Sequence, residues 1–414
     1  MVINGHNLNY RYTPSPNGSA LSTTFPNVTI ALTARLRHGS GMATKAPPAY
    51  DMSLVDHGFE AKELKGLTYP LGDHAPEYGE IYNLAPDLGW TRMPVPGNLN
   101  HINLWLLDDD PVQSDAGGNG YAIADTGLFL PDVVAHWKSM FAGALSDRQL
   151  TRIFVTHFHP DHVGCAGWLA NKFKVPVWMN RTEWLLTRLL VNEQLEHPPE
   201  DVLRRRKFYG YEEERLEMMR KGGWGNFARA VSRLPSGHHR LDDGAVVRVG
   251  HRDWQIMTGG GHTPEHACMV DHQNGVIIAG DQILPRITSN VSIMDSEPDA
   301  NPLAEWLASI AKFRAALPED MLVLPAHGFP FKGIHARLDR LAEGHHEQLD
   351  RLEAALRTKE MRGVDTFGLL FGRPIDDSIY GLATGEAMAH LRYLERAGRA
   401  SVEERDGAGW YSAQ

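Results

Sequence analysis

Cysteine, long apolar runs and positive charge are all scarce in this sequence of 414 residues. Only Cys165 and Cys268 are present, which excludes a disulfide framework. No uninterrupted apolar stretch comes near the roughly 18 residues that a membrane span needs, so we expect no transmembrane segment and no membrane partner. The net charge of −10 argues mildly against a polyanion as the main partner, although a local basic groove is compatible with it.

Acidic residues are absent from the first 50 positions, which are rich in Ser, Thr, Asn and Pro. We expect residues 1–50 to be a leader, either a disordered tail or the upstream extension of a gene whose functional start is Met42. An organelle or export signal is the alternative, because targeting segments also combine hydroxyl-rich, acid-poor composition with scattered Arg. Since the apolar run VTIALTA is short for a secretory core, we expect a cytoplasmic protein.

Strands and helices alternate from about residue 80. The segments HINLWLL (101–107) and GYAIADTG (120–127) predict neighbouring strands, because turn formers bound their β-branched and aromatic residues. Helical spacing at 132–145, followed by the short apolar run RIFVT (152–156), is typical of a layered α/β protein. A helical insert at about 181–234 separates these elements from a second series of strands. The pattern predicts two packed sheets with helices outside.

Helical periodicity returns after about residue 335. A helix, a short helix, a longer helix and a polar two-strand finish form the pattern of a winged helix. Acidic residues outnumber basic residues over 335–414, which is the wrong sign for a module that holds nucleic acid. We therefore expect residues 336–414 to form a packing or dimerisation module, so that a homodimer is one expected partner.

Histidine is abundant, at 21 residues, which directs attention to metal ligands. The run THFHPDHVG places His157, His159, Asp161 and His162 directly after a strand. Imidazole and carboxylate suit borderline divalent ions, and this spacing lets the first two residues face one ion and the last two another. A solvated polar loop is the alternative, and four ligand-type residues within six positions argue against it.

Three further candidates follow strands in the second half of the chain: His262 in GGGHTPEHA, Asp281 in IIAGDQILP and His327 in VLPAHG. Singly, each could be a polar residue at the edge of the core. Together they complete the order H-x-H-x-D-H, then H, D and H. The set resembles the metallo-β-lactamase superfamily, in its glyoxalase II-like branch, over roughly residues 80–335.

The resemblance implies a four-layer αββα sandwich at 51–335, with the helical insert and a small C-terminal winged-helix-like domain at 336–414. It implies two Zn²⁺ ions, with Fe or Mn as alternatives. The implied ligands are His157, His159 and His262 for the first ion, Asp161, His162 and His327 for the second, and Asp281 as a bridge between both. Asp125, in the ADTG turn, is implied to orient ligand histidines from beneath the site.

Two ions about 3.5–4 Å apart can share a hydroxide at neutral pH. We expect that metal-bridging hydroxide to attack a small-molecule acyl substrate (a thioester, a lactone or a similar ester), with Asp161 orienting the nucleophile or passing a proton. Neither cysteine lies in a nucleophile motif, so both should be packed residues. β-Lactam hydrolysis, as main or side activity, is one alternative. Phosphodiester hydrolysis is another, disfavoured by the acidic balance, and a non-enzymatic binding protein is disfavoured by the complete ligand set.

Four residues are weaker candidates for contact with substrate. Tyr209 and Tyr211 could belong to a lid, although on a helix only one of them would reach the pocket and packing within the insert is favoured. His266 could reach the pocket or make a structural hydrogen bond. Arg286 could meet an acidic substrate group or serve as a surface or capping residue.

Overall fold

The computed structural model describes residues 54–56, 58–110 and 119–414. The predicted leader at 1–50, Met42 included, lies outside this part of the chain. Among the described residues, no helix is both long enough and apolar enough to cross a bilayer.

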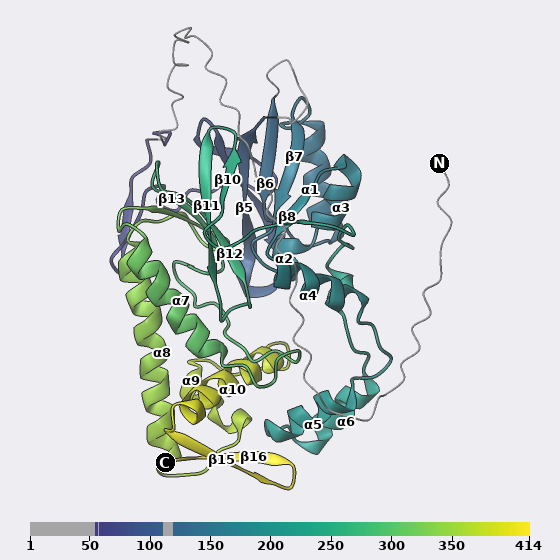
Figure 1. Ribbon diagram of the computed structural model, residues 1–414, viewed down its shortest axis with the longest axis vertical. Helices are drawn as coiled ribbons and strands as arrows, with labels where there is room; N and C mark the ends of the chain where they lie inside the picture. The colour runs from purple at the N-terminus through teal and green to yellow at the C-terminus, as the bar shows by residue number, and fades with distance from the viewer. Residues whose placement is uncertain (1–53, 57, 111–118) are drawn as a thin grey trace, which may run out of the picture. The chain divides into compact units, whose positions relative to one another are not determined.

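Two mixed sheets form the centre of the molecule (Figure 1). The first sheet has seven strands, which lie side by side in chain order: β3 (Tyr82–Ala85), β4 (Leu88–Val95), β5 (Asn100–Asp109), β6 (Gly120–Ala124), β7 (Gln149–Phe154), β8 (Val177–Met179) and β9 (His239–Arg240). Neighbours from β3 to β6 are antiparallel and those from β6 to β9 are parallel. The strands predicted at 101–107 and 120–127 correspond to β5 and β6.

The second sheet has five strands: β10 (Val246–Val249), β11 (Arg252–Gly259), β12 (His266–Asp271), β13 (Val276–Gly280) and β14 (Leu322–Pro325). Only its last pair, β13 and β14, is parallel. Every residue of β6 and of β13 is buried, which explains why GYAIA and VIIAG are continuous apolar runs without alternation.

Helices cover the outer face of each sheet. Beside the first sheet lie α1 (Pro131–Ala142), the single turn α2 (Pro160–Val163) and α3 (Ala166–Phe173) (Figure 1). Beside the second lie α7 (Pro302–Ala316) and α8 (Ile334–Leu356). Helix α1 illustrates how the sequence produces such a covering helix. Pro131 begins it, and its buried residues Val133, Trp137 and Met140 share the face that packs on the sheet.

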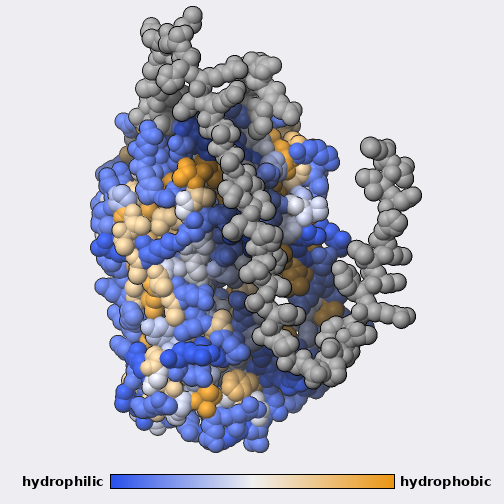
Figure 2. Space-filling model, viewed as in Figure 1, coloured by the Kyte–Doolittle hydropathy of each residue, from blue (hydrophilic) through white to orange (hydrophobic). Residues whose placement is uncertain are grey.

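Three buried apolar clusters separate the four layers. The cluster between the sheets includes Trp90, Trp105 and Trp254. One cluster lies under α1 and α3 and another under α7 and α8. The face seen in Figure 2 is accordingly mainly hydrophilic, with apolar side chains in small patches. The molecule therefore has the α/β sandwich architecture that was expected.

The remaining elements lie outside this sandwich. Near the start are the hairpin strands β1 (Lys62–Leu64) and β2 (Leu67–Tyr69), and the insert contains α4 (Arg181–Asn192), α5 (Glu200–Phe208) and α6 (Glu213–Lys221). After α8 come α9 (Phe367–Leu370), α10 (Tyr380–Arg396), β15 (Ala400–Arg405) and β16 (Ala408–Ala413). The segments Gly97–Leu99, Phe227–Arg229 and Gly363–Thr366 are 3₁₀ turns.

A buried ion triad joins the two sheets. Arg252 begins β11, and its guanidinium donates to Asp87, in the turn between β3 and β4, at 2.7 and 2.9 Å. It also donates to Asp271, at the end of β12, at 2.9 Å. All three side chains are buried. A buried charge is tolerated when it is paired in this way, so the triad fixes the position of one sheet against the other.

We predict that Arg252→Ala lowers the free energy of unfolding by about 3–5 kcal/mol, because it leaves two buried carboxylates without their cation. Denaturant titration of the variant against the wild type measures this. The matched control is Arg248→Ala, whose pair with Asp253 is 57% exposed on both sides and should change stability by less than about 1 kcal/mol. Equal losses in the two variants would contradict the role given to the triad.

Candidate metal centre

The seven predicted ligands follow strands of both sheets and meet at one end of the sandwich. His157 and His159 lie in the loop after β7, and Asp161 and His162 are in α2 directly behind it. The second sheet supplies the other three: His262 follows β11, Asp281 follows β13 and His327 follows β14.

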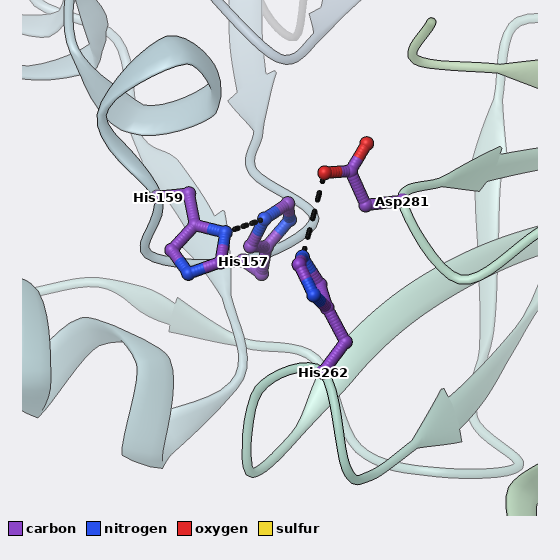
Figure 3. Close-up of side chains that lie close together, drawn as sticks. All are labelled: His157, His159, His262 and Asp281. Carbon is purple, nitrogen blue, oxygen red and sulfur yellow. Dashed lines mark hydrogen bonds and ion pairs between the residues drawn. The ribbon is translucent and has the colours of Figure 1, made fainter. Parts of the chain in front are cut away.

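The structure gathers these side chains into two groups. The first contains His157, His159, His262 and Asp281, and the second contains Asp161, His162 and His327. Within each group, one nitrogen or oxygen atom from every member lies within 4.8 Å of those of the others. Figure 3 shows the first group, in which the imidazoles of the two histidines after β7 turn toward each other and that of His262 turns toward the carboxylate.

Asp281 faces both groups with different oxygens. Its Oδ2 is 3.4 Å from His262 Nε2 in the first group. Its Oδ1 is 3.6 Å from His162 Nε2 and 3.5 Å from His327 Nε2 in the second group. Two ligand atoms on one tetrahedral zinc ion are roughly 3.4 Å apart, because each is about 2.1 Å from the metal. The spacing therefore fits a carboxylate shared by two ions.

Hydrogen bonds fix how three of the histidines present their rings. The Nδ1 of His262 donates to the backbone oxygen of Asn290 at 2.7 Å, and that of His327 donates to the backbone oxygen of His101 at 2.7 Å. The Nδ1 of His162 is 2.8 Å from Asp125 Oδ2. In each ring this leaves Nε2 as the atom that points into the groups, which is the arrangement of metal-binding histidines.

Four of the atoms that point inward have no hydrogen-bond partner within the described part of the chain. These atoms are the Nε2 of His162, His262 and His327, and Oδ1 of Asp281. All four are buried, and a buried polar atom without a partner is costly. Cations bound in the two groups would satisfy all four, so the residues fit a metal centre.

Burial and charge set the protonation of the site. Burial, with His162 and His159 nearby, holds the pKa of His157 well below its usual value, and burial and His262 lower that of His159 to about 3. Burial alone would raise the pKa of Asp281, but His327 and His162 outweigh it and hold it well below its normal range. Neutral imidazoles beside an ionised carboxylate are the forms that bind metal.

The pKa of His162 moves the other way. Burial would lower it, but Asp125, Asp161 and Asp281 together raise it well above the usual value. The same carboxylates that attract a proton to this ring attract a metal ion, so the second group is also suited to a cation.

Asp125 lies beneath the second group at the end of β6. Its Oδ1 accepts the backbone N–H of Thr156 at 2.8 Å, and its Oδ2 contacts His162 and the hydroxyl of Thr156. The Thr156 hydroxyl is also 3.0 Å from His157 Nδ1. Asp125 and Thr156 therefore hold one histidine of each group.

His266 lies in the core beneath the site and makes a structural hydrogen bond. It is fully buried, and its Nε2 accepts the backbone N–H of Asp281 at 3.0 Å. Its ring stacks on that of His157, with 4.7 Å between centroids. The sequence left open whether His266 reaches the pocket or makes a structural hydrogen bond, and in the structure it makes that hydrogen bond.

The other weak candidates for contact with substrate are Tyr209, Tyr211 and Arg286, and their neighbours in the structure are other parts of the chain. Tyr209 and Tyr211 follow α5 and are buried. Tyr209 belongs to the apolar cluster that includes the C-terminal helices, whereas Tyr211 packs with Leu203 and Leu216 of the insert, and its hydroxyl lies 3.3 Å from that of Thr384. Arg286 is exposed, with its guanidinium 5.8 Å from the ring centre of Tyr69. Cys165 and Cys268 are buried, and burial raises the pKa of both thiols, as expected of packed residues.

Glu183 is a site residue that sequence reasoning missed. It is buried in α4, where its carboxylate accepts the backbone N–H groups of Phe158 at 2.9 Å and Glu265 at 2.7 Å. It thereby ties the loop of His157 and His159 to the segment after His262, and burial raises its pKa to about 7. Nothing in the helical pattern around Glu183 distinguishes it from a surface carboxylate.

Comparison with known proteins agrees with this geometry. Residues 101–327 match the Metallo-beta-lactamase superfamily, and residues 349–414 match its "Metallo-beta-lactamase-like, C-terminal domain". A Beta-lactamase domain protein from Burkholderia ambifaria has a similar structure, with 33% identity, a TM-score of 0.73, and coverage of 84% of this chain and 99% of its own.

More distant relatives share the fold or part of the sequence. A metallo-beta-lactamase family protein from Thermus thermophilus is 23% identical, with a TM-score of 0.65 over 80% of this chain and 100% of its own. An atrochrysone carboxyl ACP thioesterase from Emericella nidulans is 23% identical over 346 residues, which are 81% of this chain and 86% of the relative. The family match and the ligand geometry lead to one conclusion: the chain belongs to the metallo-beta-lactamase superfamily.

Proposed function

We propose that this metal-dependent hydrolase uses two divalent ions to cleave an ester-like acyl bond, such as that of a thioester or a lactone. The observation that carries the proposal is the placement of Asp281, whose two oxygens face the two ligand groups separately. A single-ion site would not need a carboxylate in that position.

The ligand set favours zinc, with iron or manganese as alternatives. It consists of imidazole nitrogens and carboxylate oxygens with no thiolate, a combination that binds borderline divalent ions. Once bound, two such ions would supply an activated water at neutral pH and stabilise the charge that develops on the attacked oxygen.

The protein's own residues orient the groups and limit access. Of the seven predicted ligands, only His159 and Asp161 are partly exposed, so substrate approaches from their side. Asp161 Oδ2 is 3.3 Å from His327 Nε2, at the edge of the second group. From there its carboxylate could hold the attacking water or return a proton to the leaving group.

The acyl assignment draws support from two observations. The relative from Emericella nidulans is named as a thioesterase acting on an acyl carrier protein, and the match extends over both halves of this chain. The net charge of −10 disfavours a phosphodiester backbone as substrate, because phosphate binding relies on basic residues. β-Lactam hydrolysis, as a side activity or the main one, is the alternative within the same fold.

We also place the chain in the glyoxalase II-like branch, on the order of its ligands along the sequence. We interpret the tail as a winged-helix-like packing module, which consists of α8, α9, α10 and the β15–β16 hairpin. Its acidic balance and its burial against the insert support packing over nucleic-acid binding.

We predict that the purified chain holds about two metal ions, most simply zinc, and that Asp281→Ala loses metal and nearly all turnover. Removing the shared carboxylate should weaken metal binding by both ligand groups at once. Elemental analysis after gentle purification, with and without added zinc, measures the content. Asp253→Ala is the matched control, because Asp253 is an exposed carboxylate on β11 in the same sheet.

One ion per wild-type chain under zinc saturation would contradict the two-ion assignment. So would an Asp281→Ala variant that keeps the metal content and the rate of the Asp253→Ala control.

We predict hydrolysis of at least one thioester or lactone by the zinc-loaded protein, at a rate that changes little with salt. A small acyl substrate releases few counterions, whereas a nuclease that grips phosphates loses affinity steeply between about 50 and 200 mM salt. A panel of thioesters, lactones, β-lactams and single-stranded RNA, assayed across that range, separates the activities. Metal-dependent RNA cleavage that outpaces every acyl substrate and fades with salt would overturn the assignment.

A further inference from the structure

The loop between Asp281 and α7 touches two of the predicted ligands. Ser289 is buried, and its hydroxyl donates to the backbone oxygen of Asp281. The next residue, Asn290, accepts the Nδ1 hydrogen of His262 on its backbone oxygen at 2.7 Å. A carbonyl can only accept, so this bond fixes the tautomer of His262 and the direction of its Nε2. Any shift of this loop would therefore turn the His262 ring.

Helix α10, in the C-terminal domain, holds that loop in place. Glu386 Oε2 accepts the side-chain N–H of Asn290 at 2.8 Å. The backbone oxygen of Gly385 accepts the N–H of Ile293 at 3.2 Å, and that of Leu382 lies 3.3 Å from the hydroxyl of Ser292. Three positions on the loop, 290, 292 and 293, thus bond to one stretch of helix.

The approach of α10 to the loop is close enough to require glycine. A Cβ atom added at Gly385 would lie 2.8 Å from both the Cβ and the Oγ of Ser292, well inside van der Waals contact. Glu386 is itself anchored, since its backbone oxygen accepts from His390 Nδ1 at 2.8 Å and His390 Nε2 is 3.2 Å from His345 Nδ1 on α8. The helix is therefore a fixed support for the loop.

We propose that Glu386 is a positioning residue for the first ligand group, which it aligns through Asn290 and His262. The inference rests on the proposed metal-dependent function. It assigns the C-terminal domain a role that neither its charge nor its family match describes: it sets the affinity of one metal position, so that catalysis depends on the docking of α10. Partners of ligand histidines of this kind typically change metal affinity by about 10- to 100-fold when removed.

The test uses the full-length chain and measures metal binding, without substrate. Zinc is titrated into the metal-free protein against a chromophoric chelator, in a His327→Ala background that leaves the first group and in a His159→Ala background that leaves the second. We expect Glu386→Ala to weaken binding by about tenfold or more in the first background and to leave the second unchanged. Glu386→Gln keeps an oxygen for Asn290 and should restore binding.

Glu395→Ala is the matched control, because Glu395 lies on the same helix and pairs with Arg392. Asn290→Ala should reproduce the loss, and adding Glu386→Ala to it should cost nothing more, as expected of two residues in one chain of contacts. This second variant gives the answer if Glu386→Ala does not fold.

Wild-type affinity in Glu386→Ala or in Asn290→Ala, or an equal loss in both backgrounds, would overturn the inference and leave the proposed hydrolase intact. Conversely, a selective loss in a protein that hydrolyses no acyl substrate would support the inference while contradicting the substrate assignment.

Discussion

Everything in this structure depends on bringing five imidazoles and two carboxylates together at one end of a sandwich and removing them from water. Desolvation opposes this for each charged group, and four of the inward-facing atoms have no hydrogen-bond partner among the described residues. The arrangement is stable because backbone oxygens, Asp125 and Thr156 take up the outward-facing ring nitrogens, which leaves the inward atoms for a cation. The ligand geometry is thus determined by the partners of the ligands.

Those partners come from elements that the fold must place accurately. The second sheet supplies His262, Asp281 and His327, and the first sheet supplies the others, so the two sheets must keep one relative position. The buried Arg252 triad provides an oriented contact between them that apolar packing alone would not provide. Glu183 from the insert and Glu386 from α10 then fix the loops around the ligands. Insert and tail therefore both contact the loops that carry or support the predicted ligands.

The sequence patterns predicted the layers, and the resemblance to the superfamily implied the two ligand groups. Continuous apolar runs such as VIIAG predict buried strands, and polar residues directly after such strands gather at one sheet edge. The contacts that support the ligands could not be predicted from the sequence, because they join residues that are distant along the chain, such as the hydrogen bond from Asn290 to Glu386. His266, four residues after a ligand, showed the same limit: periodicity could not say that its ring lies under Asp281. For the tyrosines after α5, the sequence favoured packing within the insert over contact with substrate, and Tyr211 does pack there, but nothing in the sequence indicated that Tyr209 joins the cluster of the C-terminal helices.

In the metal-loaded protein, Asp281 would lie between two ions. Diffraction from crystals of the zinc-loaded protein, with data collected at the zinc absorption edge, tests this most directly. We predict two anomalous peaks about 3.5–4 Å apart, one beside His262 and one beside His162, with the Asp281 carboxylate between them. A single peak at full zinc saturation, or two peaks neither of which touches Asp281, would contradict it.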